Sequence, residues 1–369
     1  MSRLHRALRF SGLVATALAI GLSLAALPAH AKKKQKRAAS AAHPDEGRDT
    51  VAYGPREDVL RFAGEVAERR GLDEAWVQAT LAQARYIPTV ARLIMPPPAG
   101  TAKDWAAYRT RFTDSRRIAA GLAFWNANEA WLRLAEERYG VPPEIVVGIV
   151  GVETIYGQQT GNFRIVDALS TLAFDFPAGR RDRSAFFRDE LEAFLVLCRD
   201  QAIDPLAWRG SYAGAIGMPQ FMPSSIAAHA VDFDGDGRTD LLGSSADVIG
   251  SVAHFLAQAG WQRGLATHYE VAAPVATSDR VTLLGPDILP LFSPEEFVAL
   301  GARLPEEAMH LETSKLALIE LQNGDAATSY VAGTSNFYAL TRYNWSSYYA
   351  MAVIELGAAV KRLRPSAAG

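Results

Sequence analysis

Cysteine is almost absent from this chain, because Cys198 is the only one among 369 residues. An intramolecular disulfide is therefore excluded, and a hydrophobic core of ordinary size must supply the stability. Cys198 lies in the apolar run 194–198, which favours a place in the core. The N-terminal region has no lipobox cysteine that could carry a lipid.

Long apolar runs are also missing, except at the N-terminus. Three arginines within the first nine residues precede an apolar stretch over 10–27, and Ala29-His30-Ala31 has the small residues of a cleavage site. We interpret 1–31 as a secretory signal peptide and expect export to the periplasm. Since the apolar stretch is somewhat long, an uncleaved membrane anchor is the alternative. No later run is long enough to span a membrane.

The chain lacks an excess of positive charge as well. Its formal net charge is −2, and it becomes −8 without the three arginines of 1–31 and the net +3 of 32–50. So acidic a body argues against binding nucleic acid through its phosphates. The segment KKKQKR at 32–37 opens a low-complexity stretch that we expect to be a basic disordered linker. This linker either touches anionic lipid or wall polymer, or is simply solvated.

Helical periodicity dominates the rest of the chain. It predicts an N-terminal helical region over 51–115 and a helical core over 116–265, with one long helix ending at Tyr139. The pattern changes over 266–335, where we expect strands at 269–275, 280–284, 315–321 and 329–332, with Asn323-Gly324 as a hairpin turn. Helical pattern returns over 336–369. The fold class is therefore mainly α (α+β), with a small β-rich insertion.

The apolar sequence VPPEIVVGIVGVETIYG at 141–157 predicts a helix that is buried on all sides. Its two prolines suit a first turn, and Gly157 suits a C-terminal cap. Gly148 and Gly151 weaken the helix intrinsically, which indicates that another backbone approaches closely at these positions.

Glu153 lies near the end of this helix among apolar neighbours. Burial and the negative end of the helix dipole both disfavour its charged form, so its pKa should be raised. A carboxyl group that keeps its proton near neutral pH is suited to general acid catalysis. The alternative is a buried ion pair with an arginine from elsewhere, and the helix alone favours neither interpretation.

Two further stretches are candidates for the same site. The irregular sequence GSYAGAIGMPQFMPSS at 210–225 contains glycines that let a backbone approach an extended ligand, and Gln220 can both donate and accept hydrogen bonds. The sequence FYALTRYN at 337–344 combines aromatic and amide side chains, which suit sugar rings. Taken singly, Tyr338 and Tyr343 would also suit core packing.

Together with GVETIYG at 151–157, these stretches resemble the catalytic motifs of the lytic murein transglycosylases, specifically the membrane-bound lytic transglycosylase B type (glycoside hydrolase family 103). GLAFWNANE at 121–129 and DVIGSVAHFLAQAGW at 247–261 are also similar, and the resemblance extends from about residue 56 to 363. It implies a lysozyme-like catalytic core that cleaves the MurNAc-β-1,4-GlcNAc bond of peptidoglycan.

The resemblance also implies roles for single residues. Glu153 would act first as general acid and then as base. The residues expected to contact the glycan are Ser211, Gln220, Tyr343, Asn344 and Tyr338, together with Arg183 or, with weaker support, Arg181. Peptidoglycan glycan strands are the expected partner, other cell-wall enzymes are candidates, and the chain is expected to be a monomer.

The three motif stretches contain no acidic residue besides Glu153. Glycosidases commonly use two carboxylates, but the 2-acetamido group of the substrate can replace the second. The resemblance therefore implies substrate-assisted cleavage that leaves 1,6-anhydromuramic acid ends. A hydrolytic muramidase and a non-catalytic peptidoglycan-binding scaffold are the alternatives.

The sequence DFDGDGRTD at 232–240 has the alternating aspartates of an EF-hand loop. The candidate ligands are Asp232, Asp234, Asp236 and the carbonyl of Arg238. Position twelve is Gly243, so the usual closing carboxylate is missing. In the resembled family an aspartate matching Asp247 closes the loop, and Asp240 is the alternative. A structural Ca²⁺ is implied, with no cofactor for the chemistry, and a solvated acidic turn is the other interpretation.

Overall fold

The structure is a computed structural model that describes residues 51–96, 103–311 and 314–364. The helices are α1 (Glu57–Arg70), α2 (Glu74–Ala82), α3 (Pro88–Leu93), α4 (Trp105–Thr110), α5 (Ser115–Ala127), α6 (Glu129–Tyr139), α7 (Pro143–Thr154), α8 (Ile165–Phe174), α9 (Ser184–Asp200), α10 (Pro223–His229), α11 (Ser245–Gln258), α12 (Thr277–Leu284), α13 (Pro294–Ala299), α14 (Glu306–Met309), α15 (Ser335–Tyr343) and α16 (Ser347–Arg362). The strands are β1 (Phe163–Arg164), β2 (Arg209–Gly210), β3 (His268–Glu270), β4 (Ala317–Asn323) and β5 (Ala326–Gly333). No helix within the described ranges is long and apolar enough to cross a membrane. The expected signal peptide and basic linker lie outside these ranges.

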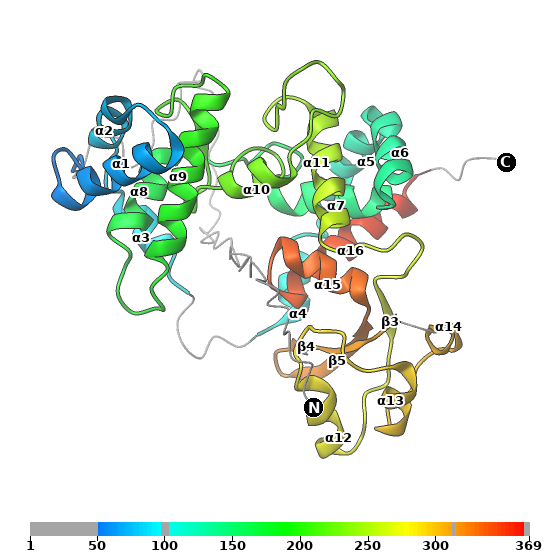
Figure 1. Ribbon diagram of the computed structural model, residues 1–369. Coiled ribbons are helices and arrows are strands. Elements are labelled where there is room, and N and C mark those ends of the chain that lie inside the picture. Colours follow the sequence, from blue (N-terminus) through cyan, green and yellow to red (C-terminus); the bar gives the residue numbers. More distant parts are fainter. Residues whose placement is uncertain (1–50, 97–102, 312–313, 365–369) are drawn as a thin grey trace, which may run out of the picture.

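One lobe of the molecule combines helices from distant parts of the sequence. Helices α1, α2 and α3 lie beside α8 and α9 (Figure 1). We expected α8 and α9 within the core range 116–265, but they pack with helices of the N-terminal region. The side chain of Glu192 on α9 accepts hydrogen bonds from Arg69 and Arg70 at the end of α1. This lobe is therefore built from two separate segments of the chain, one carrying α1, α2 and α3 and the other carrying α8 and α9.

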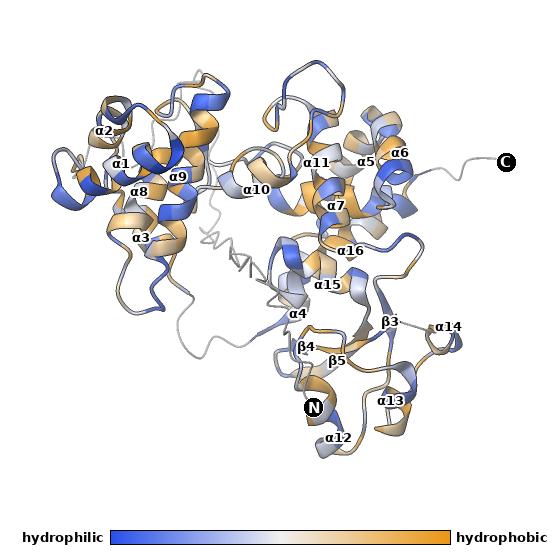
Figure 2. Cartoon of the chain, in the orientation of Figure 1, coloured by the Kyte–Doolittle hydropathy of each residue, from blue (hydrophilic) through white to orange (hydrophobic). Residues whose placement is uncertain are grey.

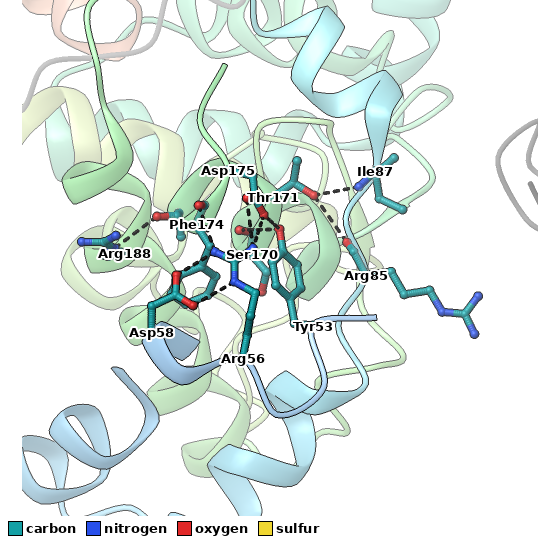
Figure 3. Close-up of polar contacts among 11 residues, drawn as sticks. Tyr53, Arg56, Asp58, Arg85, Ile87, Ser170, Thr171, Phe174, Asp175 and Arg188 are labelled. Atoms are coloured by element: carbon teal, nitrogen blue, oxygen red, sulfur yellow. Dashed lines mark hydrogen bonds and ion pairs between the residues drawn. The ribbon is translucent and has the colours of Figure 1, made fainter. Parts of the chain in front are cut away.

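A polar network fastens the start of α1 to the end of α8 (Figure 3). The guanidinium group of Arg56 donates to both carboxylate oxygens of Asp175, at 3.0 and 2.8 Å, and also pairs with Asp58. The hydroxyl of Tyr53 donates to Asp175 Oδ2 at 2.7 Å, and Arg56 lies 5.1 Å from the centre of the Tyr53 ring. Because both oxygens of Asp175 are used, this network fixes the segment that precedes α1 on the lobe.

Helices α7 and α16 form the centre of the second body of the molecule, which also contains α5, α6, α11 and α15 (Figure 1). Residues 145–152 of α7 are all buried, and Figure 2 shows hydrophobic residues where α7 meets α16. A Cβ atom at Gly148 would overlap the carbonyl oxygen of Val353, which confirms the predicted close backbone approach there. At Gly151 the prediction is wrong, because the side chains of Tyr156 and Leu356, and not a backbone, fill the space.

The predicted single helix up to Tyr139 is interrupted. Helix α5 ends at Ala127 and α6 begins at Glu129, with Asn128 between them at φ −123° and ψ 21°. The Asn128 side chain donates to the carbonyl oxygen of Phe124 at 2.8 Å. Asparagine competes in this way for local backbone partners, and this explains the break in an otherwise helical sequence.

The residues 266–311 and 314–333 form a small lobe with a three-stranded sheet in the order β3-β5-β4. The hairpin at Asn323-Gly324 is confirmed, with Gly324 at φ +59° between β4 and β5. The strand expected at 280–284 is wrong, because this segment belongs to α12. It is a short segment with three apolar residues, of which only Leu283 is buried, and periodicity cannot assign so short a segment to a strand or a helix. Of the strand expected at 269–275, only the start lies in β3.

Candidate active site

The end of α7 is a sharp turn that begins directly after Glu153 and Thr154. We expected the cap at Gly157, but the helix ends at Thr154, and Ile155, Tyr156 and Gly157 have φ values of 51°, 56° and 85°. A β-branched residue such as Ile155 is strained in this region. Strain of this kind persists only where surrounding contacts enforce it, and it is common at functional sites.

Contacts of Thr154 and Arg117 hold this turn. The hydroxyl of Thr154 donates to the carbonyl oxygen of Met218 at 2.9 Å and accepts from the N–H of Gly157 at 3.0 Å. Buried Arg117 of α5 donates to the carbonyl oxygens of Gly151 at 2.6 Å and Val152 at 3.3 Å. A cation at a helix C-terminus satisfies the free carbonyls and opposes the negative end of the dipole. The sequence analysis missed Arg117, whose role depends on the packing of α5 against α7.

Glu153 is half-buried at this helix end. Burial raises its pKa from 4.5 to about 7, and a hydrogen bond from the Tyr349 hydroxyl to Oε1, 2.6 Å long, partly opposes the rise. The predicted raised pKa is therefore confirmed. The alternative of a buried ion pair is not confirmed, since no arginine or lysine in the described ranges pairs with Glu153 and its partner is a neutral tyrosine.

Two tyrosines stand beside the Glu153 carboxyl group. Tyr349 is buried at the start of α16, and its ring lies parallel to that of Tyr343, with centroids 6.3 Å apart. The hydroxyl of Tyr343 donates to the carbonyl oxygen of Pro219 at 2.6 Å. Burial, with the charge of Glu153, holds the pKa of both hydroxyls well above the usual range, so they remain donors. Tyr349 was not predicted, and the only signal was a polar aromatic in an apolar helix.

The loop 210–221 lies against the turn that follows Glu153. Gln220, at φ +53°, donates from its amide nitrogen to the carbonyl oxygens of Thr160 at 3.1 Å and Gly217 at 2.8 Å. The hydroxyl oxygen of Ser211 accepts from the N–H groups of Ala213 and Ala215. Both side chains therefore order the backbone of this loop next to Glu153.

The remaining predicted contact residues occupy different surroundings. Asn344 follows Tyr343 and is buried, and its Oδ1 has no hydrogen-bond partner within the described chain. Tyr338 contacts Trp345 edge-on, with centroids 6.0 Å apart. Arg183 belongs to the other lobe, at the start of α9, where its guanidinium lies 4.5 Å from the centre of the Phe186 ring. The structure thus places Gln220 and Tyr343 close to Glu153. Tyr338 and Arg183 instead contact other aromatic residues, Trp345 and Phe186.

A buried carboxylate, Glu190 of α9, connects the two bodies. It accepts from the N–H of Ser224 at 2.9 Å and from its hydroxyl at 2.6 Å. Ser224 lies at the start of α10, directly after the loop that carries Gln220. Glu190 therefore anchors the end of this loop, and no motif in the sequence indicated it.

The acidic loop brings three carboxylates together. Oxygen atoms of Asp232, Asp234 and Asp247 lie within 4.8 Å of one another. Buried Asp247, in the first turn of α11, also accepts from the N–H groups of Phe233 and Asp240, each at 2.7 Å. Asp240 instead uses its own Oδ1 for the N–H groups of its loop neighbours. Asp236 is outside the cluster, and its Oδ1 accepts from the N–H of Arg238 at 2.8 Å.

Residues 55–358 match the family model described as "Transglycosylase SLT domain". The chain belongs to this family. Over 315 residues this transglycosylase is 38% identical to membrane-bound lytic murein transglycosylase B of Escherichia coli (strain K12), and the match covers 83% of each chain.

Solved structures agree with this assignment. Soluble lytic transglycosylase SltB1 from Pseudomonas aeruginosa superimposes with a TM-score of 0.75 at 39% identity, covering 83% of this chain and 98% of that one. Escherichia coli lytic transglycosylase Slt35, in complex with calcium, gives 0.73 at 36% identity and covers 88% and 99%. The predicted family, fold class and enzyme class, a peptidoglycan lytic transglycosylase, are confirmed.

Replacing Tyr349 by phenylalanine should move the alkaline limb of the pH–rate profile to higher pH. In the native enzyme the hydrogen bond from Tyr349 lowers the pKa of Glu153. Without this bond the pKa rises, so the carboxyl group keeps its proton up to a higher pH. We also expect kcat/KM to fall roughly tenfold, the value of one hydrogen bond to a charged group. Turnover of isolated glycan strands across pH measures both effects. An alkaline limb that stays in place would assign Tyr349 to packing alone.

Proposed function

We propose that this transglycosylase cleaves the MurNAc-β-1,4-GlcNAc bond of peptidoglycan with Glu153 as the only enzymic acid and base. The observation that carries the proposal is the half-buried carboxyl group with a pKa raised to about 7 and a hydrogen bond from Tyr349. A group with this pKa carries its proton near neutral pH and also accepts one. The motif stretches supply no second acid.

The chemistry follows from these two properties. Glu153 gives its proton to the glycosidic oxygen while the acetamido oxygen of the muramic sugar attacks the anomeric carbon and the glycosidic bond breaks. The ionised Glu153 then takes the proton of the sugar's own 6-hydroxyl group, whose oxygen attacks the same carbon and releases the acetamido group. An aligned intramolecular nucleophile has a large advantage in effective concentration over water. Glu153 ends protonated, and no water is consumed.

We infer that the glycan runs between the loop 210–221 and the end of α15. Gln220 and Tyr343 lie beside Glu153 through the contacts described above, and the unpartnered Oδ1 of Asn344 is suited to accept from a sugar amide or hydroxyl. Ser211 shapes the loop, Tyr338 offers an aromatic face, and Arg183 would reach the strand from the other lobe.

The products test this function directly. Glycan fragments released from purified sacculi should end in 1,6-anhydromuramic acid, lack a reducing end, and weigh one water less than the fragments that a hydrolytic muramidase releases. Mass analysis of the soluble fraction measures this difference. Reducing ends alone would establish the hydrolytic alternative, and binding without any soluble product would establish the scaffold.

We propose that the enzyme works in the periplasm, where its peptidoglycan substrate lies, with 1–31 as its export signal. Its Escherichia coli relative is a membrane-bound lytic murein transglycosylase. Intact glycan strands are its proposed partner, and it acts as a monomer.

We also propose that Asp232, Asp234 and Asp247 bind Ca²⁺, with Asp236 and the Arg238 carbonyl as further ligands. Carboxylate oxygens suit this ion, and their mutual approach within 4.8 Å is unfavourable unless a cation lies between them. Slt35 is in complex with calcium. When bound, the ion would join the loop to the first turn of α11 and take no part in bond cleavage.

Calcium should therefore raise the melting temperature of the metal-free protein. A ligand at a hundred times its Kd stabilises the native state by about 2.7 kcal/mol. Asp234→Ala should abolish the response, while Asp279→Ala, an acidic residue of α12 outside the loop, should leave it intact. Melting curves with calcium and with chelator measure the effect, and identical curves would leave the solvated turn as the interpretation.

A further inference from the structure

Helix α16 also lines a pocket, on the side opposite to the face that contacts α7. Tyr349, Val353 and Gly357 share the face toward α7 and Glu153. The residues of α16 that line a pocket on the other face are Met351, Ile354, Glu355, Ala358, Ala359 and Arg362. Since a helix turns about 100° per residue, positions such as 351, 355 and 362 point away from both 353 and 357. The body of α16 therefore separates this pocket from the catalytic carboxyl group.

The other walls come from three elements of different origin. Arg109 lies on α4, Thr113 follows that helix, Ile118 lies on α5 and His268 on β3. The pocket has a volume of about 500 Å³, within the range of small-ligand sites. Because it lies where the core meets the small lobe, a ligand would contact both.

The charge of the pocket is opposite to that of the protein. Arg109 pairs with Glu355, whose carboxyl group is also affected by the charge of Arg362, but Arg362 is exposed and belongs to no ion pair of the described residues. Burial lowers the pKa of His268, so its imidazole is neutral and supplies hydrogen bonds without charge. One net positive charge thus remains in a body whose formal charge is −8. A carboxylate is the group that this arrangement favours.

The apolar part of the pocket selects the shape of the ligand. Ala358 and Ala359 leave room beside Met351 and Ile354, and no Phe, Tyr or Trp is among the residues that line the pocket. Methyl groups fit such a wall, whereas sugar rings commonly require an aromatic face. We propose that this pocket binds a short peptide with free carboxylates and alanine-sized side chains, the chemistry of the peptide stems of peptidoglycan. Only the identification of the peptide as a peptidoglycan stem rests on the proposed function.

A free pentapeptide stem without sugars is the probe, and isothermal titration calorimetry with the full chain measures its binding. Arg362→Ala should weaken binding about tenfold or more, because it removes the unpaired cation. Lys361→Ala is the matched control and should bind like the native protein. Lys361 is the neighbouring cation, but it pairs with Glu144 of α7 at 2.7 Å and is not part of the pocket.

Two further measurements separate this pocket from the catalytic site. Ala358→Trp should fill the pocket and abolish peptide binding while lytic activity persists, which also shows that the variant folds. An N-acetylglucosamine tetramer, for which the proposed glycan site is the expected binding place, should not displace the peptide. Equal binding by Arg362→Ala, displacement by the tetramer, or no binding of the peptide at millimolar concentration would each overturn the inference.

The product assay keeps the two proposals distinct. Loss of the peptide site with anhydro products intact would refute the pocket alone. Normal peptide binding with only reducing-end products would refute the proposed reaction and leave the pocket standing.

Discussion

Glu153→Gln should lose nearly all lytic activity while the protein stays folded. Glutamine preserves the shape of the side chain and can still accept from Tyr349, but it has no proton to exchange with the glycosidic oxygen or the 6-hydroxyl group. General acid–base contributions are typically 10²–10⁴-fold, and here one group performs both steps. Release of soluble fragments from sacculi measures the loss, and near-native lysis would refute the assignment.

The thermal stability of the same variant shows that inactivity does not come from unfolding. The folded pKa of Glu153 is raised from 4.5 to about 7, so its contribution to stability is complete below the unfolded pKa and is lost as the pH rises through the folded one. Glutamine does not titrate. At pH 8 the variant should therefore be more stable than the native enzyme, by about 3 kcal/mol at most, and this advantage should shrink toward pH 5. A variant that melts below the native enzyme at both pH values would mean that the substitution damages the fold.

Gly148→Ala should destabilise the protein and displace the catalytic carboxyl group. The added Cβ would overlap the carbonyl oxygen of Val353, so α7 and α16 must move apart. Overpacking of this kind costs about 1–3 kcal/mol, and a shift of about 1 Å at a reacting group can cost about a hundredfold in rate. Denaturant unfolding and product release measure the two effects.

Gly64→Ala is the matched control for this prediction. Gly64 lies within α1, where a new Cβ would meet only the flexible end of Glu74 at 3.4 Å. The same chemical change should there stabilise the protein by about 0.5–1 kcal/mol, because alanine restricts the unfolded chain and favours the helix. Equal effects at both positions would show that the contact between α7 and α16 is looser than the structure indicates.

Several features of the site follow from local sequence alone. The apolar residues around Glu153 determine that its helix is buried, and burial is the main cause of its raised pKa. Asn323-Gly324 specifies a hairpin because of the backbone angles that these residues accept. Helix burial and turn type depend on residues a few positions away in the sequence, so the sequence pattern predicts them directly. Short segments with few apolar residues carry less information, as the helix at 280–284 shows.

The partners of Glu153 depend on tertiary structure. The Tyr349 hydroxyl that bonds its carboxyl group is 196 residues away in the sequence, and Arg117, which satisfies the carbonyl oxygens of α7, belongs to another helix. The left-handed turn at Ile155 is contrary to the preference of a β-branched residue, and tertiary contacts such as that of Thr154 with Met218 hold it. The sequence determined which carboxyl group is buried and how its proton affinity changes. Only the packing of α7 against α5, α16 and the loop 210–221 decided which groups orient it, because hydrogen-bond partners are selected by proximity in space.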